Sequence, residues 1–144
     1  MASRIVVERS TDKAVTRLVQ KGLIAHNRKS VGAARWRRFV LSAREGRRVV
    51  GGLTGVIAWN EAFVAMLWVD EAARGQGHGS RLMQAAARFA RLRRCALIYL
   101  NTFSFQAPRF YEKLGYRRFG ALKGVPARDA SRIFYVKRLS GARA

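Results

Sequence analysis

RGQGHGS, residues 74–80, lies between an apolar run and an amphipathic segment that begins near Arg81. We expect a strand, a glycine loop and the start of a helix in that order. The first turn of a helix has backbone N–H groups without partners, and the helix dipole places partial positive charge there, so a phosphate binds favourably. Glycine at 75, 77 and 79 removes Cβ atoms that would hold a phosphate away, and it permits positive φ angles. The stretch therefore predicts an anion-binding loop.

Spacing separates this loop from two other phosphate-binding motifs. A dinucleotide fingerprint, GxGxxG, that begins at Gly75 requires glycine where the chain has Ser80. One that begins at Gly77 requires glycine where the chain has Leu82. A P-loop requires Gly-Lys followed by Ser or Thr, which the sequence lacks. The remaining alternative is a glycine-rich turn that binds no ligand.

Length and composition predict one domain spanning residues 1–144, with residues 140–144 frayed at the end. Hydrophobic residues make up 49% of the chain, which argues against disorder throughout. Cys95 is the only cysteine, which excludes an internal disulfide and a cysteine-rich zinc site, and we predict no metal. The first residues lack the apolar core of a signal peptide, and no run is long enough to cross a membrane. We therefore expect a cytoplasmic protein without a membrane partner.

Charge is the second unusual feature. The chain has 29 Lys and Arg against 8 Asp and Glu, a formal net charge of +21. Such a charge attracts polyanions but says little about the fold. The basic residues are spread along the chain, and RWRR at 35–38 is the one good fragment in which they interleave with an aromatic residue. A solvated arginine-rich surface is thus favoured over a dedicated nucleic-acid site, with nucleic acid kept as an alternative partner.

Hydrophobic periodicity predicts a mixed α/β order. The expected strands are 5–8, 39–43, 49–59, 62–69, 95–100, 116–119 and 133–138, and the expected helices are 11–25, about 81–93 and 106–114, with 26–34 as a loop or a short second helix. Strand 62–69 is almost continuously apolar, which suits a central strand buried on both faces. A helical crossover would make 95–100 parallel to it.

Two motifs together carry a resemblance to a known family. Val69 followed by Arg74, Gly77 and Gly79 resembles the signature VxxxxRxxGxG of the GNAT superfamily, the acyl-CoA-dependent N-acetyltransferases. APRFYEKLGY at 107–116 is similar to the second signature, in which a small residue precedes an aromatic-Tyr pair and then Gly-Tyr or Gly-Phe. The resemblance implies a single-domain α/β GNAT-type fold, with a mixed, mostly antiparallel sheet that contains a parallel central pair and is flanked by helices.

The resemblance also implies acetyl-CoA as co-substrate. In the family the pyrophosphate rests on the glycine loop, and the pantetheine arm runs like an added strand where two parallel strands splay apart, here 62–69 and 97–101. The residues expected to contact the cofactor are Leu67, Trp68, Val69, Arg74, Gly75, Gln76, Gly77, His78, Gly79, Ser80, Asn101, Ser104, Ala107 and Phe110. Backbone groups near 67–69 would also stabilise the oxyanion. Ser104 departs from the family, which commonly has asparagine there.

Tyr111 is the expected catalytic residue, because the family's tyrosine at this position protonates the departing CoA thiolate. A phenol is protonated at neutral pH, and a developing thiolate is the stronger base in a water-poor site. A buried tyrosine with one structural hydrogen bond is the alternative. The general base is left open among Glu61, Asp70, His26, a water relay and an amine that arrives neutral.

The expected reaction transfers an acetyl group from acetyl-CoA to a primary amine of a small molecule or a protein by direct attack. The net charge favours a neutral or anionic amine over a polyamine. The alternative is a basic nucleic-acid-binding module that keeps a GNAT-like fold without turnover. Two phenylalanines in the link 102–106 would shape the acceptor pocket or pack beneath it. The oligomeric state is open, with a homodimer among the states considered.

Overall fold

The computed structural model describes residues 2–139, which fall into two compact units divided between Ala34 and Arg35. The expectation of one domain remains a prediction. Residues 140–144, which were expected to fray, lie outside the described residues. No helix within residues 2–139 combines the length and the apolar character that a bilayer crossing requires.

The first unit contains helix α1 (Lys13–Val31). The Asp12 carboxylate accepts hydrogen bonds from the backbone N–H groups at positions 14 and 15, at 3.0 and 3.2 Å, and so caps the helix. Residues 26–31, expected as a loop or a second helix, continue α1 to Gly32, because Arg and Lys are good helix formers and favour the negative end of the helix dipole. The expected strand at 5–8 is wrong, since these residues join no sheet.

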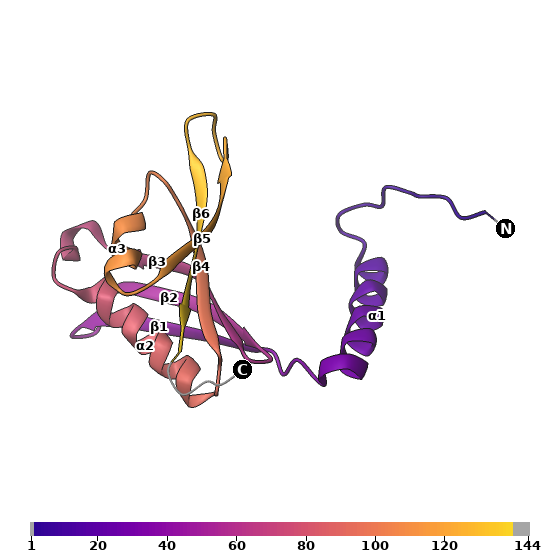
Figure 1. The fold of residues 1–144 in the computed structure, drawn as a ribbon, viewed down its shortest axis with the longest axis horizontal. Helices are drawn as coiled ribbons and strands as arrows, with labels where there is room; N and C mark the ends of the chain where they lie inside the picture. Colours follow the sequence, from indigo (N-terminus) through magenta and orange to yellow (C-terminus); the bar gives the residue numbers. More distant parts are fainter. Residues whose placement is uncertain (1, 140–144) are drawn as a thin grey trace. The chain divides into compact units, whose positions relative to one another are not determined.

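The second unit is a six-stranded sheet with two helices and a 3-10 turn (Figure 1). Its elements are β1 (Arg37–Glu45), β2 (Arg48–Ala58), β3 (Glu61–Val69), η1 (Glu71–Ala73), α2 (His78–Leu92), β4 (Leu97–Phe103), α3 (Pro108–Lys113), β5 (Arg117–Lys123) and β6 (Ser131–Arg138). The strand order is β1-β2-β3-β4-β6-β5, with β3 and β4 parallel and the other neighbours antiparallel. The predicted mixed α/β sheet with a parallel central pair is confirmed.

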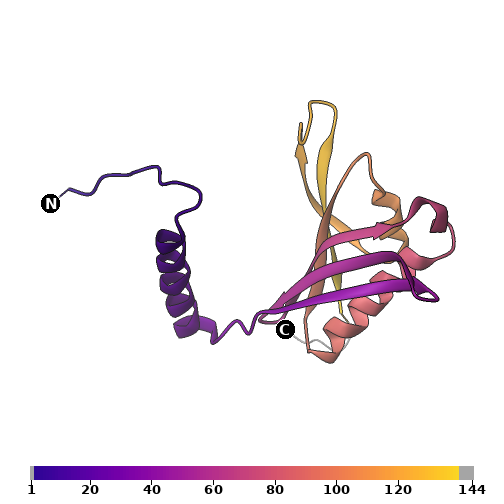
Figure 2. The same cartoon turned by 180° about the vertical axis from the view of Figure 1, so that it is seen from behind.

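Helix α2 covers one face of the sheet, against β1, β2, β3 and β4 (Figure 2). Its buried residues recur at helical spacing and are Leu82, Met83, Ala86, Ala87 and Ala90. They pack against buried strand residues such as Leu53 and Ile98. The ring of Phe89 lies 4.8 Å from that of Phe39, which joins the helix to β1. Burial of this apolar surface fixes α2 against the sheet.

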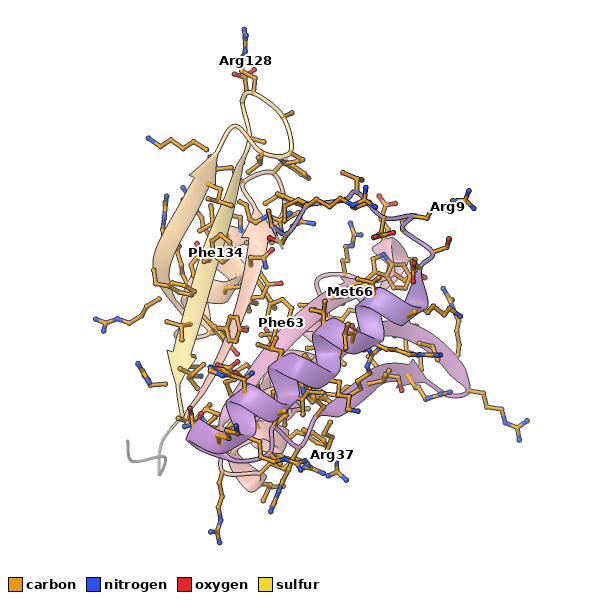
Figure 3. The ribbon with its side chains drawn as sticks, turned by 90° about the vertical axis from the view of Figure 1, so that its right-hand side faces the viewer. Arg9, Arg37, Phe63, Met66, Arg128 and Phe134 are labelled. Atoms are coloured by element: carbon orange, nitrogen blue, oxygen red, sulfur yellow. The ribbon has the colours of Figure 1, made fainter. Side chains whose placement is uncertain are left out.

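Within the second unit, strand β3 is buried on one face only, whereas its apolar sequence predicted burial on both faces. Met66 and Trp68 are 65% and 57% exposed, and Ala65 is exposed beside them. Figure 3 shows the side chains of Met66 and Phe63 on this strand. Helix α2 covers one side of β3, and no other described helix of this unit contacts the apolar residues of the other side.

Candidate active site

The two parallel strands separate after a short paired stretch. Register partners between β3 and β4 run only from Glu61 and Leu97 to Phe63 and Tyr99. Immediately beyond, β3 has a bulge, because Gly55 of β2 faces position 64 while Thr54, the residue before it, faces position 66. A bulge bends the strand and increases its twist. The C-terminal half of β3 therefore has a backbone edge that β4 does not pair.

A cleft of about 920 Å³ lies at this separation. It is bounded by the C-terminal half of β3, the glycine loop, the start of α2, the end of β4 and helix α3. A volume of this size is typical of a site for a cofactor or small molecule.

Most of the residues expected at the site line this cleft. They are Leu67, Trp68, Val69, Arg74, Gly75, Gly77, His78, Gly79, Ser80, Asn101, Ala107, Phe110 and Tyr111. Gln76 and Ser104 are not among the lining residues. The backbone N–H of Ser104 donates to the Ser131 carbonyl at 2.8 Å, and its Oγ accepts from the Ser131 N–H at 3.0 Å. The structure thus gives these two expected cofactor contacts no support.

The cleft also contains residues that the sequence analysis did not select as cofactor contacts. They are Ala65, Met66, Ala73, Thr102, Phe105 and Gln106. Gln106 shapes the link after β4, because its Oε1 accepts from the Thr102 hydroxyl at 2.9 Å and from the Phe103 N–H at 2.8 Å. No sequence signal indicates that this exposed glutamine holds the link.

The glycine loop presents free backbone donors. None of the N–H groups of residues 75–80 donates a hydrogen bond within the described part of the chain. Helix α2 begins at His78, earlier than expected, so residues 78–80 form its first turn. Gly75 and Gly77 have φ angles of +79° and +83°, which glycine adopts without strain. The loop therefore offers consecutive N–H donors at the positive end of a helix, as an anion site requires.

Gly79 serves a different purpose from the one its spacing predicted. It is helical and lacks a positive φ. A Cβ at this position would lie 3.2 Å from Cζ of Phe110. The absent side chain thus lets the Phe110 ring approach the first turn of α2 closely, and this contact sets α3 beside the loop.

Two sets of side-chain contacts hold the loop in place. Nε of Arg74 donates to the Val69 carbonyl at 3.0 Å, across the turn that joins β3 to α2. Nη2 of Arg81 lies 3.0 Å from Nδ1 of His78, and Nε2 of the same ring lies 3.3 Å from Oε1 of Glu45 at the end of β1. Because guanidinium only donates, Nδ1 is the acceptor and the proton is assigned to Nε2, which faces the carboxylate.

Tyr111 lies on α3 and is 9% exposed. Its ring is in contact with those of Phe110, Tyr116 and Tyr135, at centroid distances of 5.0, 6.2 and 6.1 Å. Its hydroxyl has no hydrogen-bond partner within residues 2–139, so the structural role considered as the alternative has no support. Burial raises the pKa of this hydroxyl, which keeps it protonated at neutral pH.

Neither of the two carboxylates considered as general base, Glu61 and Asp70, lines the cleft. Glu61 is at the paired end of β3, away from the separation. The Asp70 carboxylate is bound by the guanidinium of Arg48. His26 lies in α1, in the other unit, so its position relative to the cleft is not defined. Among the described residues, no Asp or Glu lines the cleft.

An aromatic pair and a cation lie next to two residues that line the cleft, Phe105 and Asn101. The rings of Phe103 and Phe105 stack at 5.3 Å, and Phe105 lines the cleft. Nη1 of Arg132 on β6 donates to Oδ1 of Asn101 at 2.7 Å, and its Cζ lies 4.7 Å from the centre of the Phe103 ring. Since Leu100 is buried on the α2 face, alternation places the side chains at 101 and 103 on the opposite face of the sheet.

Comparison with known proteins relates the whole arrangement to acetyltransferases. The model of the acetyltransferase (GNAT) family matches residues 12–116. Blasticidin-S acetyltransferase of Streptomyces morookaense is 41% identical over 83 residues, which are 57% of this chain and 61% of that relative, so the match spans less than two thirds of its length.

Solved structures agree with the family match. A crystal structure of an acetyltransferase from Bacillus cereus superposes with a TM-score of 0.83 at 32% identity, covering 94% of this chain and 98% of that one. An aminoglycoside 6'-N-acetyltransferase complexed with coenzyme A shares the fold, with a TM-score of 0.68 at 18% identity over 98% of this chain and 100% of that one. Because the family model matches residues 12–116, which are most of this chain, the chain belongs to the GNAT family of acetyltransferases.

Proposed function

We propose that this protein transfers the acetyl group of acetyl-CoA to a primary amine by direct attack. The observation that carries the proposal is the row of free N–H groups at residues 75–80, which opens into the same cleft as Tyr111. A pyrophosphate on the loop would direct the pantetheine arm along the unpaired edge of β3. Amide groups of that arm can then pair with the strand as a neighbouring strand would.

The chemistry is a nucleophilic substitution at the thioester carbonyl. The amine nitrogen forms a bond to the carbonyl carbon, and a backbone N–H near 67–69 stabilises the oxyanion. The carbon–sulfur bond then breaks, and the departing thiolate takes the proton of the Tyr111 hydroxyl. The new amide loses its extra proton to water, and solvent restores the tyrosine.

The acceptor is proposed to be a neutral or anionic amine of a small molecule. No carboxylate within the described residues lines the cleft to attract a polycation, and Arg132 retains N–H donors beyond the one that binds Asn101. A guanidinium on the face opposite α2 suits an acceptor that carries a carboxylate or phosphate. The name of the relative from Streptomyces morookaense, a blasticidin-S acetyltransferase, supports a small-molecule acceptor.

Tyr111→Phe tests the proposed proton donor. We expect kcat for thiol release to fall by about 10²–10⁴-fold, the usual contribution of a general acid. The acetyl-CoA dissociation constant, measured by calorimetry, should stay within about twofold, because the hydroxyl holds no hydrogen bond in the described structure. Tyr99→Phe, which alters a tyrosine outside the cleft lining, is the matched control.

The same experiments separate the competing functions. Wild-type turnover by Tyr111→Phe on a validated acceptor would remove the tyrosine from the mechanism and leave the acetyl transfer standing. Absence of acetyl-CoA binding by the wild type, together with salt-dependent binding of random DNA, would instead favour the nucleic-acid-binding module.

Arg132→Ala tests the acceptor class. If the guanidinium binds an anionic group, KM for a carboxylate-bearing amine rises at least tenfold while KM for a neutral amine of the same size changes little. Arg132→Lys should restore affinity only in part, since an ammonium lacks the planar fork of donors. Equal loss for both amines would show that Arg132 acts only by positioning Asn101.

A further inference from the structure

A second hollow lies away from the cleft, between α2, the end of α3 and β6. Its volume is about 390 Å³, and it shares no lining residue with the cleft. Met83, Ala87 and Leu114 give it an apolar part. Its charged lining residues are Arg88, Arg91, Lys113 and Lys137, and no acidic residue of the described chain lines it. The chain has thus gathered cations around a concave apolar surface without a counter-charge.

Three of the four cations are available to a ligand. Nζ of Lys137 donates to the Leu114 carbonyl at 2.9 Å and is already engaged. The side chains of Arg88, Arg91 and Lys113 form no hydrogen bond or ion pair within residues 2–139. Like charges held together repel one another, so an anion between them lowers the free energy of the folded chain.

Tyr116 distinguishes this hollow from a merely basic surface. It lines the hollow, is only 4% exposed, and its hydroxyl is buried with no hydrogen-bond partner in the described structure. A buried hydroxyl without a partner is costly, and a ligand oxygen would remove that cost. A hollow on α1, lined by Arg17, Lys21, Arg28 and Lys29 among others, is equally basic but has no buried residue. The high content of Lys and Arg therefore explains why hollows of this protein are basic, but it does not explain a buried hydroxyl without a hydrogen-bond partner.

We propose that the hollow between α2, α3 and β6 is a second anion site, which binds a small, multiply charged phosphate-type anion in addition to CoA. The free guanidinium and ammonium groups bind the charged oxygens, and the Tyr116 hydroxyl donates to one of them. The site is joined to the proposed proton donor, because the Tyr116 N–H donates to the Tyr111 carbonyl at 3.1 Å and the two rings meet edge to face at 6.2 Å. We therefore expect an anion bound in this hollow to change the environment of the Tyr111 ring.

Calorimetry with inorganic pyrophosphate on the CoA-saturated protein tests the site, since CoA first fills the glycine loop. We expect about one pyrophosphate per chain. Arg88→Ala combined with Arg91→Ala should weaken the affinity at least tenfold. Arg17→Ala combined with Lys21→Ala removes the same charge from the other hollow and should leave the affinity within about twofold.

Tyr116→Phe gives a readout that a general loss of charge would not. It removes a buried hydroxyl without a partner, so the free protein should melt at a higher temperature, while the stabilisation by pyrophosphate should shrink. In protein with ¹³C-labelled tyrosine, pyrophosphate should shift the ring resonances of Tyr116 and Tyr111 and leave those of Tyr99 in place.

Three results would overturn the proposal. The first is that the free protein binds pyrophosphate but the CoA-saturated protein does not, because the second hollow would then belong to the coenzyme site. Another is equal loss of affinity in the two double variants, which reports net charge alone. The third is binding of an RNA oligonucleotide at this face without binding of pyrophosphate. The proposed acetyl transfer is assayed separately by thiol release, so either idea can fail alone.

Discussion

Gly55 offers a sharp test of how the sheet is packed at the bulge. A Cβ added at this glycine would lie 2.3 Å from Cζ of Phe39 and 2.7 Å from the backbone oxygen of Phe63. Non-bonded carbon atoms prefer separations of about 3.5–4.0 Å, so Gly55→Ala requires a movement of about 1 Å. The Phe39 ring is 6% exposed and packs on Phe89, and the other obstacle is backbone, so neither moves freely.

The expected loss of stability follows from these contacts. Overpacking costs about 1–3 kcal/mol, and disturbance of an aromatic pair costs about 0.5–1.5 kcal/mol more. Reduced entropy of the unfolded chain offsets about 0.4–1 kcal/mol. The net is about 2 kcal/mol, which for a unit of this size corresponds to a melting temperature lower by about 10 °C.

Urea unfolding followed by tryptophan fluorescence measures this loss, with Gly120→Ala as the control. Gly120 is also in a strand, yet its added Cβ would meet nothing within 4 Å. We expect the control to stay within about 0.5 kcal/mol of the wild type. A difference below about 1 kcal/mol between the two variants would refute the packing that we describe around the bulge.

Three further predictions concern the loop, the core and the tyrosines. Gly77→Ala forces a left-handed φ on a residue with a Cβ, at a cost of about 1–2 kcal/mol. Calorimetry should show acetyl-CoA binding at least tenfold weaker than in the control Gly22→Ala, whose added Cβ has open space. Cys95 is 1% exposed and burial raises the pKa of its thiol, so Ellman's reagent should label it only after unfolding in urea; rapid labelling of the native protein would contradict its burial. Burial raises the pKa of Tyr111 and Tyr116 above the ordinary value of 10.0, so the stability that they contribute is complete below pH 10.0 and is lost as the pH rises through their folded pKa values; stability that stays level from pH 9 to 12 in urea titrations would oppose this.

Local signals in the sequence were sufficient for the glycine loop and for the crossover, whereas Tyr111 as proton donor stays a prediction. Gly75 and Gly77 adopt the positive φ angles that glycine permits, and this preference does not depend on distant parts of the chain. A phosphate at the loop needs only backbone donors. The crossover from β3 through α2 to β4 follows from the order of apolar runs, because connections of this kind are parallel. The position of Tyr111 beside the loop came from the resemblance between motifs, and the structure places it in the same cleft.

Other features depended on neighbours that are distant in the sequence. Strand 62–69 was predicted to be buried on both faces because its residues are almost all apolar. Hydrophobicity alone does not show which face of a strand a helix covers. The segment at 5–8 has the composition of a strand but no neighbouring strand to pair with. His78 was expected in the loop, yet helix α2 begins at this residue. Gly77, just before it, adopts the left-handed conformation that ends the loop.

The sequence by itself therefore determined a glycine loop at the start of a helix and a parallel crossover, each specified by residue types at fixed spacing, and the resemblance between motifs singled out Tyr111. Only the tertiary structure decided the rest. Strand β3 has a bulge opposite Gly55 near the point where it separates from β4, and Arg132 of β6 binds Asn101 of β4. Tyr116, whose hydroxyl is buried, lines one hollow together with cations of two helices. The physical reason is that backbone conformation responds to local residue types, whereas side-chain pairing and desolvation depend on which distant segments the fold brings together.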